Sequence, residues 1–164
     1  MLRKRRPKVA LASERAEDPS AALAAAVALL ARRDFCCGEL REQLAAQGFE
    51  TRALEQALAD LRERHYLDDE RYAGQFVAYH AERGQGPLRI GRDLAEVGVS
   101  AELVEAALAA HGDWARLARE VRTRRFGLAL PSSWPEKARQ ARFLQYRGFS
   151  IDHVRSALGP DAIP

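Results

Sequence analysis

The residues best suited to chemistry in this chain are arginines that alternate with aromatic side chains in the C-terminal third. They are Arg139, Arg142 and Arg147 among Phe143, Tyr146 and Phe149, preceded by Arg122, Arg124, Arg125 and Phe126. Guanidinium groups bind phosphate bidentately and aromatic rings can stack on bases, so the pattern is typical of a nucleic-acid-binding face. An ordinary basic helix with a solvated surface has the same pattern, and Phe143 and Phe149 also fall on positions expected in the core.

Residues that would indicate catalysis are scarce. The four histidines are dispersed, and neither His-Glu-x-x-His nor a paired Cys-x-x-Cys motif occurs. Residues 84–87 (GQGP) lack the lysine and hydroxyl of a phosphate-binding loop and indicate a turn. Asp68, Asp69 and Glu70 could hold magnesium, but helix capping explains them better because they precede a predicted helix. We therefore expect a protein that is not an enzyme, with no catalytic residue, metal site or cofactor.

The elements that must position the arginines follow a period of fifty residues. Leucine and glycine recur together without a gap, and the apolar positions after them recur in the same register. The recurring sets are Leu44/Leu94/Leu144, Gly48/Gly98/Gly148, Phe49/Val99/Phe149, Leu54/Val104/Val154, Ala57/Ala107/Ala157 and Leu58/Leu108/Leu158. Core packing explains these apolar positions, because a small helical unit must bury one face of each helix. Repeats of this length usually stack so that each contacts only its neighbours, which favours binding along another large molecule.

The composition indicates helix almost throughout, since alanine, leucine, arginine and glutamate dominate. We expect an all-α fold of three tandem three-helix repeats that form an elongated, curved array. The predicted helices are 21–33, 37–47, one capped by Thr51, 70–81, 88–97, one capped by Ser100, one beginning at Trp114, 136–146 and 151–158. The predicted organisation is a basic, disordered arm (1–19), repeats at 20–64, 65–111 and 112–158, and a tail (159–164).

Charge is distributed unevenly along the 164 residues. The arm contains Arg3, Lys4, Arg5, Arg6 and Lys8, the middle of the chain is acidic, and residues 112–158 carry ten basic and four acidic groups. One end could therefore contact nucleic acid while another part contacts a protein, although a solvated surface without a polyanionic partner is the alternative. Without an apolar run of 18 residues or a signal peptide, and with adjacent Cys36 and Cys37, we expect a reduced, cytoplasmic protein that does not bind membranes.

A three-helix unit with a short turn before its last helix is also found in helix-turn-helix proteins that read duplex DNA. Here the last helices of the first two repeats present carboxylates, at Glu50, Glu55, Glu102 and Glu105. Because carboxylates repel phosphates, sequence-specific reading of DNA is the weaker hypothesis.

Five strings of residues, in this order and spacing, resemble the RecX family of bacterial recombination regulators over residues 21–158. They are YLDDERYA from Tyr66, GPLRI from Gly86, LAEVGVS from Leu94, DWARLA from Asp113 and FLQYRGF from Phe143. The resemblance implies a non-catalytic modulator of the RecA recombinase, built from tandem three-helix units, that lodges in the groove of the RecA-DNA filament. Its partners would be the RecA filament and the single-stranded DNA within it, and it would restrain ATP hydrolysis, coprotease stimulation and strand exchange.

Within that resemblance we expect electrostatic contacts from Arg139, Arg142 and Arg147 and from Arg89 and Arg92 of the middle repeat. Tyr66, Asp68 and Asp69 are expected to be structural, and the protein is expected to be a monomer. Two features depart from the family pattern. Many relatives carry a serine near Cys36 as a helix cap, and cysteine is a poorer cap. The basic arm matches no family motif, so a contact assigned to it depends on charge alone.

Two other functions fit the sequence. The first is a general nucleic-acid-binding module, independent of RecA, that uses the arm and the third repeat. The second is a helical adaptor for another protein, which would bind no DNA.

Overall fold

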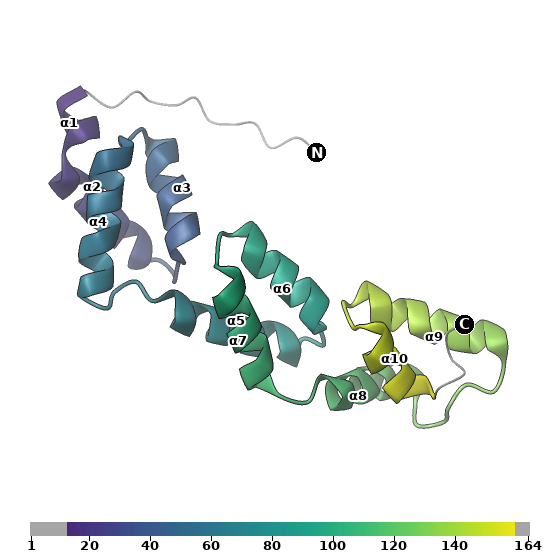
Figure 1. The fold of residues 1–164 in the computed structure, drawn as a ribbon. Coiled ribbons are helices and arrows are strands. Elements are labelled where there is room, and N and C mark those ends of the chain that lie inside the picture. Colours follow the sequence, from purple (N-terminus) through teal and green to yellow (C-terminus); the bar gives the residue numbers. More distant parts are fainter. Residues whose placement is uncertain (1–12, 160–164) are drawn as a thin grey trace. The chain divides into compact units, whose positions relative to one another are not determined.

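The computed structural model describes residues 13–159 of the chain, and these residues form helices and connecting loops without a strand (Figure 1). The described helices are α1 (Ser13–Glu17), α2 (Pro19–Leu30), α3 (Cys37–Gln47), α4 (Thr51–Glu63), α5 (Asp69–Glu82), α6 (Pro87–Glu96), α7 (Ala101–His111), α8 (Trp114–Phe126), α9 (Trp134–Tyr146) and α10 (Ile151–Leu158). The all-helical fold expected from composition is confirmed. No helix in this part of the chain has the length and apolarity needed to cross a membrane.

The chain divides into two compact units. Unit 1 comprises the residues up to Tyr72 together with Val97–Val99, and unit 2 comprises Ala73–Glu96 and the residues from Ser100 onward. The turn between α6 and α7 thus belongs to unit 1, although the two helices that it joins lie in unit 2.

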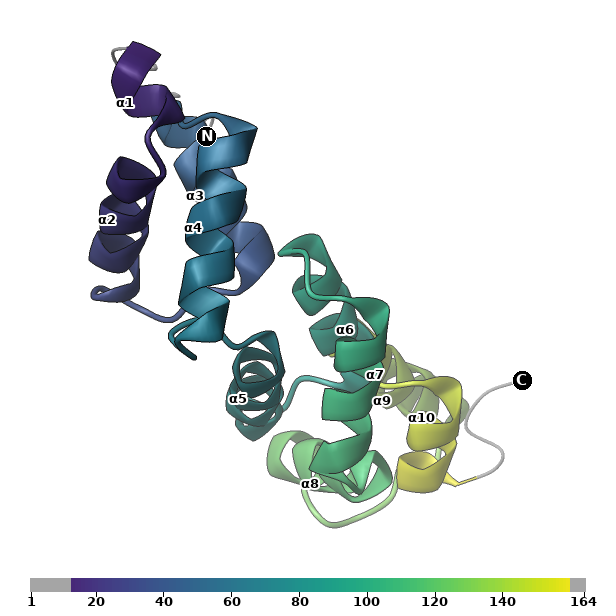
Figure 2. The ribbon, with the colours of Figure 1, turned by 60° about the vertical axis from the view of Figure 1, so that its left-hand side comes forward.

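In unit 1, α2 packs along α4, and α3 packs against both (Figure 2). Ala22 and Ala26 of α2 and Ala53 and Ala57 of α4 are almost fully buried. Small side chains on both helices let their backbones approach closely, and the leucines of α3 and α4 fill the remaining space. The recurring apolar positions of the first repeat therefore form its core.

Helix α1 lies within the segment for which the sequence predicts a disordered arm, so that prediction is wrong for Ser13–Glu17. The carbonyl of Ala16 accepts a hydrogen bond from the backbone N–H of Glu50 (2.9 Å), and Asp18 caps α2 by accepting one from Ser20 N–H (2.9 Å). These polar contacts order the segment although no apolar stripe marks it. The predicted arm contacts Arg3, Lys4, Arg5, Arg6 and Lys8 lie outside the described residues.

Most helix positions agree with the sequence prediction, and those of α3 and α10 agree at both ends. The predicted cap Thr51 is wrong. Thr51 is the first helical residue, and Glu50 takes the N-cap position without a side-chain hydrogen bond. Ser100 caps α7 as predicted, with its hydroxyl accepting from Leu103 N–H (3.4 Å).

Helices α8, α9 and α10 of unit 2 form a second core, in which α8 packs along α10. Leu144, Phe149 and Val154 are buried there, as their place in the repeat predicts. The middle repeat differs, because α5 does not pack along α7 in the way that α2 packs along α4.

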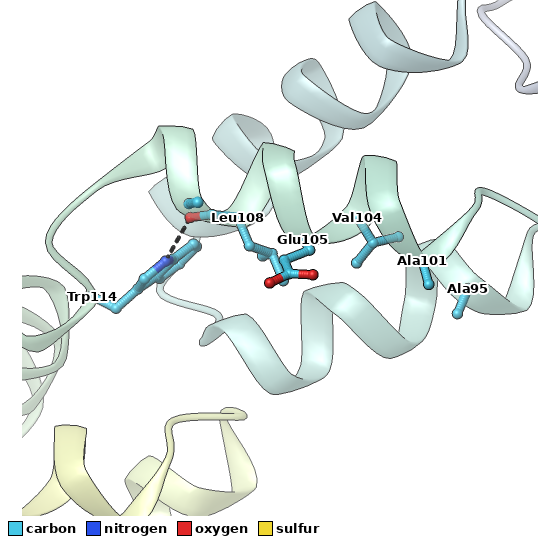
Figure 3. Close-up of a pocket in the computed structure, with 7 residues that line it drawn as sticks. Ala95, Ala101, Val104, Glu105, Leu108 and Trp114 are labelled. Carbon is cyan, nitrogen blue, oxygen red and sulfur yellow. Dashed lines mark hydrogen bonds between the residues drawn. The ribbon is translucent and has the colours of Figure 1, made fainter.

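Helix α7 is consequently only partly covered. Val104, Ala107 and Leu108 are half-buried, whereas their counterparts in the other repeats are buried, so the prediction that they lie in a closed core is wrong. An apolar hollow of about 480 Å³ remains beside α7 (Figure 3). Trp114 lines one end of it and donates its indole N–H to the carbonyl of Leu108 (2.9 Å).

Each unit contains a close backbone contact between the start of one helix and the turn before another. In unit 1, Gly38 at the start of α3 lies against Val97 and Gly98, and a Cβ at Gly38 would lie 2.9 Å from Gly98 Cα. In unit 2, Gly86 donates its N–H to Arg147 O (2.7 Å) and Leu88 donates to Gly148 O (3.0 Å). Two of the recurring glycines, Gly98 and Gly148, are therefore needed for close approach.

We predict that Gly86→Ala lowers the free energy of unfolding by about 1–3 kcal/mol, the usual cost of overpacking. The new Cβ would overlap the backbone of Gly148 and lie 2.5 Å from Phe149 N. Gly74→Ala, inside α5 with nothing within 4 Å, is the matched control and should gain about 0.5–1 kcal/mol. Urea unfolding of both variants is the measurement, and equal stability of the two would contradict the steric argument.

A second prediction concerns pH. His153 Nδ1 accepts a hydrogen bond from Ser150 N–H (3.3 Å), which needs the neutral ring, and burial lowers the pKa of His153 despite the opposing charges of Asp152 and Asp113. The unfolded chain then binds the proton more readily, so stability is present above the ordinary histidine pKa of about 6.5 and is lost as the pH falls below it.

His153→Gln keeps a capping acceptor but cannot titrate in this range, so it should reduce the loss of stability between pH 7.5 and pH 5.5. Urea unfolding at both pH values tests this. An unchanged loss in the variant would assign the pH dependence to other groups.

Candidate nucleic-acid interface

Four arginines of unit 2 border one small hollow of about 140 Å³. They are Arg83, Arg124, Arg125 and Arg147, and the remaining lining residues are Gly84, Val121 and Phe143. None of these lining residues, all within the described part of the chain, is acidic. We call the four arginines the arginine cluster.

The cluster forms where three helices end. Arg83 directly follows α5, Arg124 and Arg125 lie in the last turn of α8, and Arg147 is the C-cap of α9. Positive side chains are favourable at this end of a helix because the unpaired carbonyls carry partial negative charge. This local preference accounts for each arginine singly, whereas their meeting at one hollow depends on how the helices pack.

Two members of the cluster are held in place. Arg147 donates from Nη1 to the carbonyl of Arg83 (3.0 Å) and lies 5.3 Å from the centre of the Phe143 ring. The guanidinium of Arg83 lies 3.5 Å from the centre of the Tyr79 ring. Gly84 permits this packing, since a Cβ there would lie 2.9 Å from Val121 Cγ2. Ordered guanidinium groups lose less conformational entropy when they bind an anion.

The other two members of the cluster, Arg124 and Arg125, have exposed side chains. Within residues 13–159, neither Arg124 nor Arg125 forms an ion pair, in contrast to Arg116 of the same helix, which pairs with Glu120 (3.4 Å). Four positive groups around a hollow without an acidic lining residue create a local field that attracts anions, and the guanidinium geometry matches phosphate as well as carboxylate.

The structure separates the five arginines that the sequence predicted as contacts. Only Arg147 belongs to the cluster. Arg89 and Arg92 border a different hollow of about 440 Å³, together with Asp93 and Glu96, and Arg89 Nε lies 3.9 Å from Asp93 Oδ2. That second hollow has mixed charge, so its attraction for phosphate is weaker.

Of the remaining two predicted contacts, Arg139 is exposed but pairs with Glu136 (2.9 Å), and Arg142 is exposed on the same helix, α9. Arg122, which the sequence grouped with the basic face, is buried. Its Nε donates to Gln140 Oε1 (3.0 Å) and its Nη2 donates to the carbonyl of Ala129. Arg122 is therefore a structural residue.

Sequence reasoning missed Arg83. It stands 64 residues from Arg147, and no local pattern links the two. A signal was present in the dipeptide Arg83-Gly84, because glycine after a helix often adopts the left-handed C-cap, and a basic residue is favoured at that helix end.

The acidic residues before α5 and the two cysteines at the start of α3 have structural roles. Asp68 Oδ1 accepts from Arg71 N–H (2.9 Å), as expected for a cap, and Asp69 Oδ1 accepts from Cys37 N–H at the start of α3 (2.7 Å). Cys36 also caps α3, with Sγ accepting from Glu39 N–H (3.5 Å). Both thiols are buried, and burial raises the pKa of Cys36 and raises that of Cys37 to about 11, so neither is an activated nucleophile.

The chain is similar to known proteins over most of its length. Two family models match, described as the second three-helix domain of RecX (residues 68–108) and the third three-helix domain of RecX (residues 113–158). "Regulatory protein RecX" of Halorhodospira halophila is 44% identical over 81% of this chain and 83% of its own length. The protein of the same name from Vibrio vulnificus is 40% identical over 84% of this chain and 90% of its own length.

The fold is also found in solved structures. The crystal structure of RecX from Lactobacillus salivarius superposes with a TM-score of 0.76 at 19% identity, covering 85% of this chain and 94% of that one. At this identity the likeness concerns the fold.

We predict that Arg124→Ser with Arg125→Ser weakens binding to a single-stranded oligonucleotide and lowers the slope of log affinity against log salt. Each phosphate that the variant no longer neutralises should reduce the slope by about 0.7. Arg116→Ser with Arg119→Ser removes the same charge from the same helix and is the control, because those side chains already bond to Glu120 and Ser156. Fluorescence anisotropy over a salt series is the measurement, and an equal weakening in the two double variants would show that only net charge matters.

Proposed function

The chain belongs to the RecX family of regulatory proteins, and we propose that it binds the RecA-DNA filament and inhibits its activities. The observation that carries this proposal is the match to two successive RecX domains together with identities of 40–44% to relatives named as regulatory proteins. The activities restrained would be ATP hydrolysis, strand exchange and coprotease stimulation, so the protein would modulate recombination and DNA repair.

Such inhibition requires surfaces that bind the filament and does not require a catalytic group. A bound protein shifts a filament toward a less active state only if it binds that state more tightly. The arginine cluster would supply contacts to the phosphates of the single-stranded DNA, with Arg89, Arg92, Arg139 and Arg142 as further contacts. The hydrogen bonds of Cys37 with Arg62 and Asp69 in unit 1 support the fold.

The same proposal includes the remaining features of the sequence prediction. The repeats would span 20–64, 65–111 and 112–158, and the protein would act as a cytoplasmic monomer. The basic residues Arg3, Lys4, Arg5, Arg6 and Lys8 would add contacts to DNA.

A second candidate function is a general nucleic-acid-binding module that acts without RecA. The arginine cluster favours it, because guanidinium groups such as those of Arg124 and Arg125, which form no ion pair with any described residue, bind the phosphates of any single strand. Binding to bare single strands in rising salt, measured with and without residues 1–12, is compared with the inhibition of RecA. Strong binding that depends on this segment, without inhibition of RecA, favours the general module.

The decisive test is RecA's ATP hydrolysis, stimulated by single-stranded DNA, with this protein titrated in. DNA is held in excess, so that competition for free strands is excluded. We expect inhibition at less than one protein per RecA subunit, because a regulator that acts on filament ends or on several subunits need not saturate them.

The variant with Arg124→Ser and Arg125→Ser is included at the same concentrations and should inhibit less than the wild type. Normal hydrolysis in the presence of excess folded wild-type protein would reject the proposed function and leave the general module or an adaptor.

A further inference from the structure

The loop between α8 and α9 (Figure 1) joins two helices of unit 2. It exposes large apolar side chains, although the surrounding chain is highly charged. Leu128 is 87% exposed and Leu130 is 63% exposed, and Trp134 at the start of α9 is 54% exposed. All three lie within seven consecutive residues, 128–134. Single exposed leucines are common on protein surfaces, but a group of three on one loop is a typical feature of an interaction site.

The corresponding loops of the other repeats do not expose such residues. In the loop between α2 and α3, Phe35 is 7% exposed and lies under the guanidinium of Arg33, 3.6 Å from its ring centre. The loop between α5 and α6, residues 83–86, contains no apolar side chain. Leu88, the second residue of α6, is 58% exposed, so the middle repeat has one exposed leucine directly after this loop. Within the described residues, two exposed leucines inside the loop itself are found in the third repeat.

The loop is fixed in position. Arg122 is 3% exposed, and it donates one hydrogen bond to the carbonyl of Ala129, between the two leucines, and another to the buried Gln140 of α9. Pro131 is buried as well and restricts the backbone directly after Leu130. Because Ala129 and Pro131 are held against the core of unit 2, the leucines beside them are displayed in a defined geometry.

The charge around the loop indicates what it contacts. Residues 122–142 contain six basic residues and one acidic residue, and that acid, Glu136, is paired with Arg139. A complementary surface would combine an apolar pocket for the leucines and Trp134 with carboxylates at its edge. Proteins offer this combination, whereas a phosphate backbone offers no aliphatic pocket.

We propose that the loop of residues 127–134 is a protein anchor, whose leucines and Trp134 insert into an apolar, carboxylate-edged pocket on a RecA subunit. This inference rests on the proposed function and adds a protein contact to the phosphate contacts of the arginine cluster. Exposed tryptophan is a common centre of binding energy at such interfaces, since it buries a large area with few rotatable bonds.

The first test uses Leu128→Ser with Leu130→Ser, with Ile151→Ser as the control. Ile151 is 49% exposed on α10 of the same unit, so the control also removes an exposed apolar side chain. We expect the loop variant to need roughly tenfold more protein for half-inhibition of RecA's ATP hydrolysis, and the control to behave as the wild type.

The loop variant loses no charge, so its affinity for bare single strands and the salt slope of that affinity should remain those of the wild type. This result would show that the loop contributes to binding RecA and does not contribute to binding DNA, in contrast to the arginine cluster. Full inhibition by a folded loop variant would overturn the loop proposal while leaving the proposed function intact. Failure of the wild type to inhibit would instead reject the proposed function itself.

The second test uses the two tryptophans of the chain, labelled with fluorotryptophan and observed by fluorine NMR. Trp114 is 9% exposed and serves as the internal reference, while Trp134 reports on the loop. We expect the Trp134 signal to shift or broaden more than the Trp114 signal when RecA filament is added, and to stay unchanged with bare DNA. Equal changes at both tryptophans would contradict a loop contact.

A membrane surface is the competing partner for a basic loop with exposed leucines and tryptophan. Sedimentation with vesicles that contain anionic phospholipid distinguishes it. We expect no binding to vesicles, and binding that is abolished in the loop variant would overturn the proposal in favour of a membrane contact.

Discussion

The close backbone contact between a helix start and a turn is the constraint on which the rest of each unit depends. Gly38 meets Val97 and Gly98 in unit 1, and Gly86 meets Gly148 in unit 2. A side chain on either partner would separate the backbones, and the hydrogen bonds from Gly86 and Leu88 to the turn would be broken. The apolar residues beside these turns, such as Phe149, can be buried because the backbones approach so closely.

The contact in unit 2 brings helix ends together, and this explains why several arginines of unit 2 lie close to one another. Arg147 follows directly on α9 and Arg83 on α5, so the contact of Gly86 with residues 147 and 148 also brings these two arginines together. Each arginine is favoured locally by the carbonyls of its own helix end. Their combined charge exceeds what the helix ends neutralise, and this excess makes the cluster the main candidate binding surface, whereas Arg116 and Arg139, already paired with acids, attract a phosphate less strongly.

Unit 2 contains two different candidate binding surfaces. The arginine cluster offers charge and hydrogen-bond donors, which suit phosphate, and the loop anchored by Arg122 offers aliphatic and aromatic surface, which suits a protein pocket. Arg122 shows why charge alone does not identify a contact. Its guanidinium is buried and its hydrogen bonds hold the loop, so its role is to support the neighbouring apolar surface.

The sequence by itself determined the helices, the fifty-residue period and the family, because helix periodicity, caps and motifs are local properties of the chain. The bounds of α3 and α10 could therefore be predicted, while the error at Thr51 was a shift of one residue at a cap. Only the tertiary structure decided that Arg83 joins Arg147, that Arg122 is buried, that α7 is half-covered and that Leu128 and Leu130 remain outside. These outcomes depend on packing between residues far apart in sequence, and the same local pattern is compatible with either burial or exposure.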